Sequence, residues 1–105
     1  MVGNYKVELH DGDAIRQKII LELSLLDQDS LEVHTKVANT LNGKWIFTDG
    51  MYKGLLMSTR MMAPPDLVRI EGFLSMGCME GLDVKKDGDK LVLNHAGSTL
   101  VLARQ

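Results

Sequence analysis

The sequence predicts a mainly β protein: a small antiparallel β-barrel of lipocalin- or calycin-like topology, with one amphipathic α-helix packed on it or in it. Most of the chain alternates apolar and polar residues with period two, as half-buried strands do. One stretch after residue 64 changes to helical spacing, and glycine-containing turns separate the short segments. Because eight or so short strands exceed what one flat sheet covers well, we expect the sheet to close.

Length and composition indicate a single domain over residues 1–105. With 45% hydrophobic and 25% charged residues, the chain lies near the globular average and away from disordered proteins. A domain of this size buries enough surface to fold without a disulfide or a metal. We expect Trp45 to anchor the core, and Tyr5 and Tyr52 to place their hydroxyls at the barrel rim.

Three alternating segments occupy the first third of the chain. Residues 5–9 alternate and end in a turn-forming cluster at 10–13. Residues 19–26 also alternate, although a helix remains possible there because Leu and Glu favour helices. Residues 31–37 give the cleanest strand pattern of this half. We expect a strand at each of the three segments. In the second strand, residues 19, 21, 23 and 25 should lie on the same face.

Two glycine-containing steps predict turns in the middle of the chain. Residues 39–43 end in Asn-Gly, which adopts positive φ at low cost, so we expect a hairpin that leads into a strand at 45–48. Asp-Gly at 49–50 predicts the next turn. Residues 51–62 then form a further extended segment.

The spacing becomes helical after the Pro-Pro-Asp step at 64–66, which suits the first turn of a helix. Gly81 is placed to end this helix. Gly72 and Gly77 each cost about 1 kcal/mol relative to alanine, which implies close packing or a bend. The apolar stripe comprises Leu67, Ile70, Leu74 and Cys78, flanked by Phe73 and Gly77.

The end of the chain returns to period two. We expect strands at residues 82–86, 90–94 and 99–104, joined by turns at 87–89 and 95–98. Consecutive antiparallel strands of this kind form a meander.

Charge and cysteine content exclude several classes of protein. A formal net charge of -2 lacks the basic excess of nucleic-acid-binding proteins. The single cysteine, Cys78, excludes an intrachain disulfide and fits a reducing compartment. No apolar run approaches the roughly 20 residues that span a bilayer, and the first residues lack a signal-peptide pattern. We expect a soluble, cytoplasmic protein with no transmembrane segment and no nucleic-acid partner.

The order of several short motifs resembles the META/HslJ domain family. The likeness runs from about Val33 to Arg104, with a weaker match at residues 3–5. The Met-Met-Ala-Pro-Pro step at 61–65 is similar to the trypanosomatid META virulence proteins. The motifs are Gly-Lys-Trp at 43–45, Asp-Gly at 49–50, Ser-Thr-Arg-Met-Met at 58–62, Pro-Pro at 64–65, Glu71, Gly-Asp-Lys-Leu-Val-Leu at 88–93 and Gly-Ser-Thr-Leu-Val-Leu at 97–102.

Two departures from the bacterial pattern indicate the cellular compartment of this protein. Ala38 stands where bacterial members often carry a cysteine before asparagine, and Met62-Ala63 stands where they carry a second cysteine just after Thr-Arg-Met. A protein in a reducing compartment tolerates the loss of both. The resemblance implies a small barrel-like fold without known catalysis or cofactor. It also implies a virulence- or stress-associated role, and for the trypanosomatid members a location near the flagellar pocket.

The residue types of catalysis and metal binding form no recognisable motif. His10, His34 and His95 have no metal-ligand spacing. Cys78 falls at the C-terminal end of the helix, whose dipole opposes a thiolate. The aspartates at 11–13 and 87–89 flank turn glycines. We expect no catalytic residue, no metal and no cofactor, and an enzyme is the third hypothesis.

Methionine is the one compositional excess, with seven in 105 residues and six of them between positions 51 and 79. Irregular core packing under the helix is the plainer explanation, since Met often fills gaps. The alternative is a surface of flexible thioethers that adapts to apolar ligands or partners. The candidate region comprises Leu55, Met57, Met61, Met62, Ile70, Leu74 and Met76.

Two functions follow from these expectations. The first is a non-enzymatic binding module for an unidentified protein partner. The second is a carrier that holds a lipid acyl chain or another small apolar molecule between barrel and helix, lined by the candidate residues other than Met62. A cavity inside the barrel would distinguish the two. The oligomeric state is not predicted.

Overall fold

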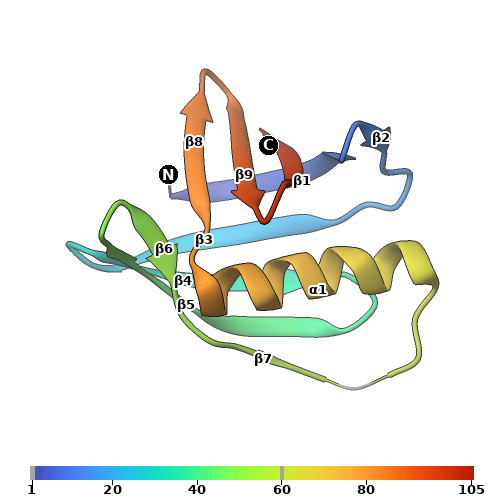
Figure 1. Cartoon of the computed structure of the whole chain (residues 1–105), viewed down its shortest axis with the longest axis horizontal. Coiled ribbons are helices and arrows are strands. Elements are labelled where there is room, and N and C mark those ends of the chain that lie inside the picture. Colours follow the sequence, from blue (N-terminus) through green and yellow to red (C-terminus); the bar gives the residue numbers. More distant parts are fainter. Residues whose placement is uncertain (1, 60) are drawn as a thin grey trace.

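The computed structural model describes residues 2–59 and 61–105, and this part of the chain contains ten strands and one helix (Figure 1). The predicted mainly β class is confirmed. The helix α1 follows β7 and precedes the last three strands. The elements are β1 Gly3–His10, β2 Asp13–Ala14, β3 Ile20–Asp27, β4 Ser30–Lys36, β5 Thr40–Thr48, β6 Met51–Lys53, β7 Leu56–Ser58, α1 Pro65–Glu80, β8 Asp83–Asp87, β9 Lys90–His95 and β10 Ser98–Arg104.

The strands form one antiparallel sheet in the order β6-β5-β4-β3-β1-β10-β9-β8. Neighbours in this order follow one another along the chain, except that β1 pairs with both β3 and β10. The short strand β2 pairs with β1, and β7 pairs with β5 beyond the end of β6. The sheet is therefore an up-and-down meander whose first and last strands lie side by side.

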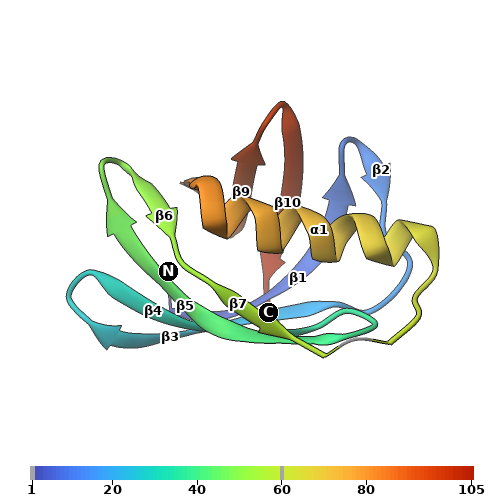
Figure 2. The ribbon, with the colours of Figure 1, turned by 60° about the horizontal axis from the view of Figure 1, so that its bottom comes forward.

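The two ends of this sheet meet at one residue pair in the described part of the chain. Tyr52 of β6 donates its N–H to the carbonyl of Leu82 at 3.0 Å and accepts the Leu82 N–H at 2.8 Å. Elsewhere β7 and β8 are apart, and α1 lies across the open side of the curved sheet (Figure 2). The barrel is thus nearly closed, and the helix fills the remaining gap.

Apolar side chains of the sheet and the helix fill the space between them. Burying each side chain of leucine size contributes about 1.5–3 kcal/mol to folding. The buried face of α1 is the predicted stripe, with Leu67, Ile70, Phe73, Leu74, Gly77 and Cys78. The strands and the residues beside them contribute Tyr5, Val7, Ile19, Leu21, Leu23, Leu31, Val33, Leu41, Trp45, Leu82, Leu91, Leu93, Leu100 and Leu102.

The helix begins and ends where the sequence predicts. Its first residue is Pro65, and the Gly81 N–H donates to the carbonyl of Gly77 at 2.6 Å, with Gly81 at φ 118°. A Cβ at Gly77 would meet the Leu82 side chain at 2.5 Å, so close packing explains that glycine. A Cβ at Gly72 would meet nothing within 4 Å. None of the described helices is long and apolar enough to cross a bilayer.

Most expected strands lie within two residues of their predicted bounds, and residues 19–26 form a strand rather than a helix. One side chain of that strand departs from its expected face. Ile19, Leu21 and Leu23 are buried, but Leu25 is 66% exposed. The pairing with β4 is irregular after Leu25, and the hairpin there extends beyond the core.

A hairpin leads into residues 45–48 as predicted, but its turn lies at 37–39 rather than 39–43, because β5 runs straight through the Asn-Gly step. Gly43 is needed for a different reason. A Cβ there would lie 2.1 Å from the Leu55 carbonyl oxygen, and a Cβ at Gly54 would lie 1.9 Å from the Lys44 carbonyl oxygen. Two glycines on facing segments therefore let the chain between β6 and β7 press against β5.

The extended segment predicted at 51–62 is interrupted. Its pairing with β5 stops after Lys53 and resumes at Leu56, because the Gly54 N–H donates instead to the Cys78 carbonyl at 2.8 Å. Residues 59, 61 and 62 lie outside the strands. The Arg60 position falls outside the described residues. This interruption ties the segment between β6 and β7 to the C-terminal part of α1.

Trp45 anchors the core as predicted, with no exposed surface. Its Nε1–H donates to Sγ of Cys78 at 2.7 Å, which links β5 to α1. Burial raises the pKa of the Cys78 thiol to about 12, and the hydrogen bond from Trp45 offsets only part of this effect. The expectation for Tyr5 is wrong, because its hydroxyl is buried without a hydrogen-bond partner among the described residues. Tyr52 is half-buried, and burial raises its pKa.

Replacing Gly43 by alanine should lower the free energy of unfolding by at least about 2 kcal/mol, since the new Cβ would overlap backbone atoms. Urea denaturation followed by circular dichroism measures the change. Gly72→Ala is the matched control and should raise stability by about 1 kcal/mol, since its Cβ enters open space on a helix. Equal effects of the two substitutions would contradict this account.

The Cys78 thiol should react with a disulfide reagent at pH 8 at least about a hundredfold more slowly in the native protein than in the unfolded chain. The folded state also binds the thiol proton more tightly than the unfolded state, whose pKa is near 9.0. This contribution to stability is complete below pH 9 and is lost as the pH rises toward 12. Cys78→Ala should remove that pH dependence; an unchanged alkaline profile would refute it.

Candidate functional site

The six methionines between positions 51 and 79 are on the surface. Each is at least 41% exposed, and Met57, Met61 and Met62 reach 79%, 62% and 102%. Core packing under the helix is therefore the wrong explanation for them. Exposed methionines form a flexible, polarizable surface that adapts to the shape of an apolar partner.

Three of these methionines line a groove between β7 and α1, which we call the methionine groove. It has a volume of about 760 Å³. Its strand side is formed by Leu56, Met57, Ser58, Thr59, Met61 and Met62, its helix side by Val68, Glu71 and Ser75, and one end by Asn39. The helix residues are spaced by three and four positions, so they share one flank of α1 beside the buried stripe.

The Glu71 carboxylate ties the helix to the turn between β4 and β5. It accepts the N–H of Ala38 at 3.1 Å and the N–H of Asn39 at 2.6 Å through Oε2. Oε1 accepts the Asn39 side-chain amide at 3.0 Å. Because hydrogen bonds to a charged group are the stronger ones, this carboxylate fixes the position of Asn39.

Asn39 in turn holds the segment that carries the methionines. Its side chain is buried, and Nδ2 donates to the Met61 carbonyl at 3.1 Å. Its Oδ1 accepts the Met61 N–H at 2.7 Å and the Thr59 hydroxyl at 3.0 Å. One asparagine thus joins the turn, the helix and the chain after β7. The sequence analysis missed this role, since Asn39 and Glu71 are 32 residues apart.

The strand side of the groove has an unpaired edge. The Thr59 N–H donates to the Thr40 carbonyl at 3.2 Å, and this register makes Met57 the next hydrogen-bonded residue of β7. The backbone groups of Leu56 and Ser58 therefore point away from β5 and toward the groove. Among the described residues β7 pairs with β5 alone, and Leu56 and Ser58 make no backbone hydrogen bond outside the sheet.

The structure divides the seven candidate residues between several places. Met57, Met61 and Met62 line the methionine groove, and Met57 also lines a hollow of about 690 Å³ on the outer face of the sheet with Leu55. Ile70 and Leu74 belong to the core and are 0% and 1% exposed, while Met76 lies on the other flank of α1. The expected lining of one internal cavity by six of them, all but Met62, is therefore wrong, because the helix turns its apolar stripe inward and its methionines outward.

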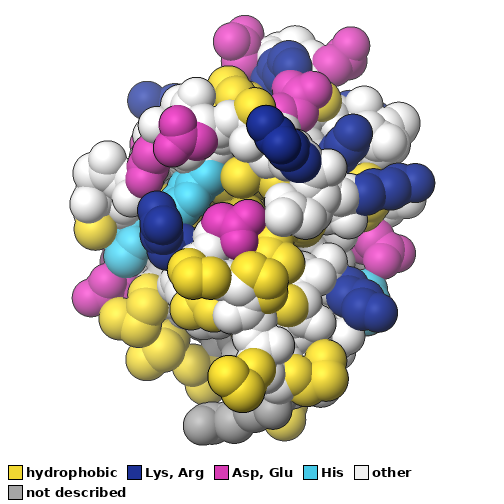
Figure 3. Space-filling view, turned by 90° about the vertical axis from the view of Figure 1, so that its right-hand side faces the viewer, with side chains coloured by type: hydrophobic (Ala, Val, Ile, Leu, Met, Phe, Trp, Pro, Cys, Tyr) yellow, Lys and Arg dark blue, Asp and Glu magenta, His cyan; other side chains and the backbone are white. Residues whose placement is uncertain are grey.

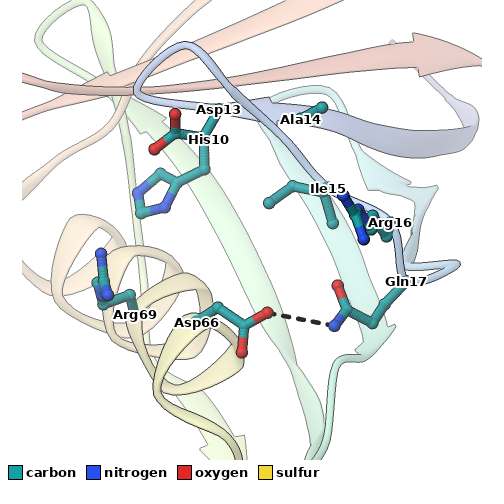
Figure 4. A pocket seen from close by; sticks show the side chains of 8 residues that line it. All are labelled: His10, Asp13, Ala14, Ile15, Arg16, Gln17, Asp66 and Arg69. Carbon is teal, nitrogen blue, oxygen red and sulfur yellow. Dashed lines mark hydrogen bonds between the residues drawn. The ribbon is translucent and has the colours of Figure 1, made fainter.

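The other flank of α1 borders a polar cleft that the sequence analysis did not predict. It consists of two adjoining hollows, of about 220 Å³ and about 240 Å³, which share His10 and Arg69. In Figure 4 the Arg69 side chain extends from α1 toward His10, and Gln17 donates to Asp66 across the cleft at 3.2 Å. At the end of the molecule where α1 begins, charged side chains of both signs lie above a group of apolar side chains (Figure 3).

Three rings contact one another at this cleft. Phe73 makes edge-to-face contacts with His10 and His95, at centroid distances of 5.8 Å and 6.3 Å. His95 Nε2 also lies 2.7 Å from a carboxylate oxygen of Glu80. A backbone hydrogen bond from Thr99 is the main cause that lowers the pKa of nearby Asp11. Within the described residues, no three His, Cys, Asp or Glu side chains gather as metal ligands.

Comparisons with known proteins agree with this architecture. A family model described as the META domain matches residues 1–105. A solved structure described as the NMR structure of a protein is similar over 97% of this chain and 88% of that chain, with a TM-score of 0.83 and 20% sequence identity. At that identity the likeness concerns the fold alone. No curated protein matches the sequence.

Replacing Asn39 by alanine should lower the free energy of unfolding by about 3 kcal/mol, since it removes four side-chain hydrogen bonds and leaves buried partners unpaired. Urea denaturation measures this loss, and amide hydrogen exchange of Met61 should accelerate. The control Asn42→Ala, at an exposed position of β5, should cost less than about 1 kcal/mol. Comparable losses at both asparagines would show that Asn39 has no special role.

Proposed function

Because the chain belongs to the META domain family, we propose that it is a non-enzymatic binding module whose docking surface is the methionine groove. The observation that carries this proposal is the exposure of Met57, Met61 and Met62 along one groove. Soluble monomers rarely place contiguous large apolar side chains in water unless they contact a partner. The groove is also rigidly framed, since Asn39 and Glu71 fix both of its sides.

The occupant that fits this groove best is an extended apolar segment of a protein partner. Leu56 and Ser58 offer backbone donors and acceptors toward the groove, as the edge of a sheet does when it accepts another strand. Alternate side chains of such a strand would contact Met57 and Val68 on opposite sides. Strand addition would satisfy the backbone groups that β7 leaves unpaired.

A carrier of a lipid acyl chain or another small apolar molecule is the second candidate. It is favoured by the volume of the groove, about 760 Å³, and by its apolar walls. An acyl chain cannot pair with the backbone of Leu56 and Ser58, and Ile70 and Leu74 are occupied in core packing. We therefore place a protein segment first.

The setting that we propose for this interaction is a virulence- or stress-associated process in the cytoplasm, near the flagellar pocket, as the resemblance to the trypanosomatid META proteins implies. A reducing compartment is supported by Cys78, which is a free, buried thiol that accepts a hydrogen bond from Trp45.

Replacing both Met57 and Met61 by lysine should weaken binding of extended apolar peptides at least about tenfold, because two contacts would become charged. The probes are decapeptides with alternating apolar residues, selected from a random peptide array. Fluorescence anisotropy gives their Kd, and the Leu56 and Ser58 amides should shift on binding. Stability should change by less than about 0.5 kcal/mol, since both side chains are exposed.

Met79→Lys is the matched control, because Met79 is 59% exposed and lies outside the methionine groove. It should leave peptide binding unchanged. Equal losses from Met79→Lys, or selected peptides that shift other amides, would contradict the proposal. Tight binding of fatty acids to the same amides, with no peptide selected, would support the carrier instead.

A further inference from the structure

The polar cleft offers donors that the chain itself does not use. Among the described residues no carboxylate oxygen lies within salt-bridge distance of Arg69 or Arg16, although ion pairs occur elsewhere in the protein. Figure 4 shows both arginines among the side chains that line the first hollow. A guanidinium group is the side chain best suited to bind a carboxylate or a phosphate.

The acidic side chains at the cleft are mostly engaged with the chain. Asp11 accepts the Thr99 N–H at 2.8 Å and the Ser98 hydroxyl at 3.1 Å, and Asp66 accepts the Gln17 amide. Asp13 is the remaining carboxylate of the first hollow. The cleft therefore holds three carboxylates and two guanidinium groups, and Arg69, which no carboxylate of the described residues pairs with, is the cation common to both hollows.

Gly72 supplies a second and independent observation. It lies in the middle of α1, where glycine costs about 1 kcal/mol relative to alanine. Unlike Gly77, it contacts nothing that a Cβ would displace, and its backbone has ordinary helical φ. It lines the second hollow beside Arg69, Phe73 and Met76. Neither packing nor backbone conformation explains Gly72, whereas a molecule lying against the helix would.

We propose that the polar cleft binds a small organic anion, with its carboxylate or phosphate at Arg69 and its apolar body over Gly72. Phe73, held between His10 and His95, forms a rigid apolar wall, and exposed Met76 can close over the ligand. Two hollows of about 220 Å³ and about 240 Å³ suit a small molecule rather than a polypeptide. The site is separate from the methionine groove, which lies on the opposite flank of α1.

The test uses four probes and nuclear magnetic resonance titration of the whole protein. Phenylacetate and phenyl phosphate carry an apolar body with each anionic group, inorganic phosphate lacks the body, and benzyl alcohol lacks the charge. The two organic anions, or one of them, should shift the amides of Arg69, Gly72 and Phe73 and bind at least about tenfold more tightly than benzyl alcohol. The comparison of the two identifies which anionic group the site prefers.

Arg69→Gln should weaken the organic anions at least about tenfold, whereas Lys86→Gln removes the same charge on β8 and should leave binding within about twofold. Gly72→Ala should weaken the organic anions but not inorganic phosphate, while it raises the melting temperature. A higher melting temperature would show that the variant is folded, so its weaker binding would come from the methyl group that occupies the ligand's place. Equal effects of Arg69→Gln and Lys86→Gln, benzyl alcohol binding as tightly as the anions, or shifts confined to the methionine groove would each overturn the proposal.

Discussion

The incomplete closure of the sheet determines where everything else lies. In the described part of the chain β6 and β8 meet at the single pair Tyr52 and Leu82, and a sheet left open there would expose its core to water. The helix must cover that opening, and its apolar stripe is buried in doing so. Because a helix inserted between two strand edges has two flanks, the fold produces two surface depressions. The methionine groove lies along one flank of α1, and the polar cleft lies along the other.

Apolar packing places the helix over the opening, and long-range polar contacts fix its position along the sheet. Glu71 and Asn39 connect α1 to a turn and to the chain that follows β7, and Trp45 connects β5 to Cys78. Each contact is short, buried or charge-assisted, so it allows little sliding of the helix along the sheet. The groove therefore has a defined width rather than the variable width of a surface loop.

Much of the fold could be predicted from local pattern, because period two and helical spacing report which side chains are buried. The stripe at Leu67 and Ile70 and the terminal meander are examples. The Asn-Gly step before Lys44 was misleading, since the glycine serves a close approach from Leu55 that no local pattern reveals. The exposure of the methionines and the cleft at Arg69 also depend on residues far apart in the chain. Only the three-dimensional arrangement distinguishes a methionine that fills a core from one that faces water.

The pairing of the first strand with the last has a consequence for how the molecule is made. Tyr5 lies opposite Arg104, and the Gln105 N–H donates to the Asn4 carbonyl at 2.9 Å. During synthesis β1 can pair with β3 early, but its other edge stays unpaired until β10, Ser98–Arg104, has been made. Contacts this distant in sequence slow folding and leave a strand edge open to aggregation in the interval. The free edge of β1 is therefore the part of the sheet most exposed to wrong pairing while the chain is being made.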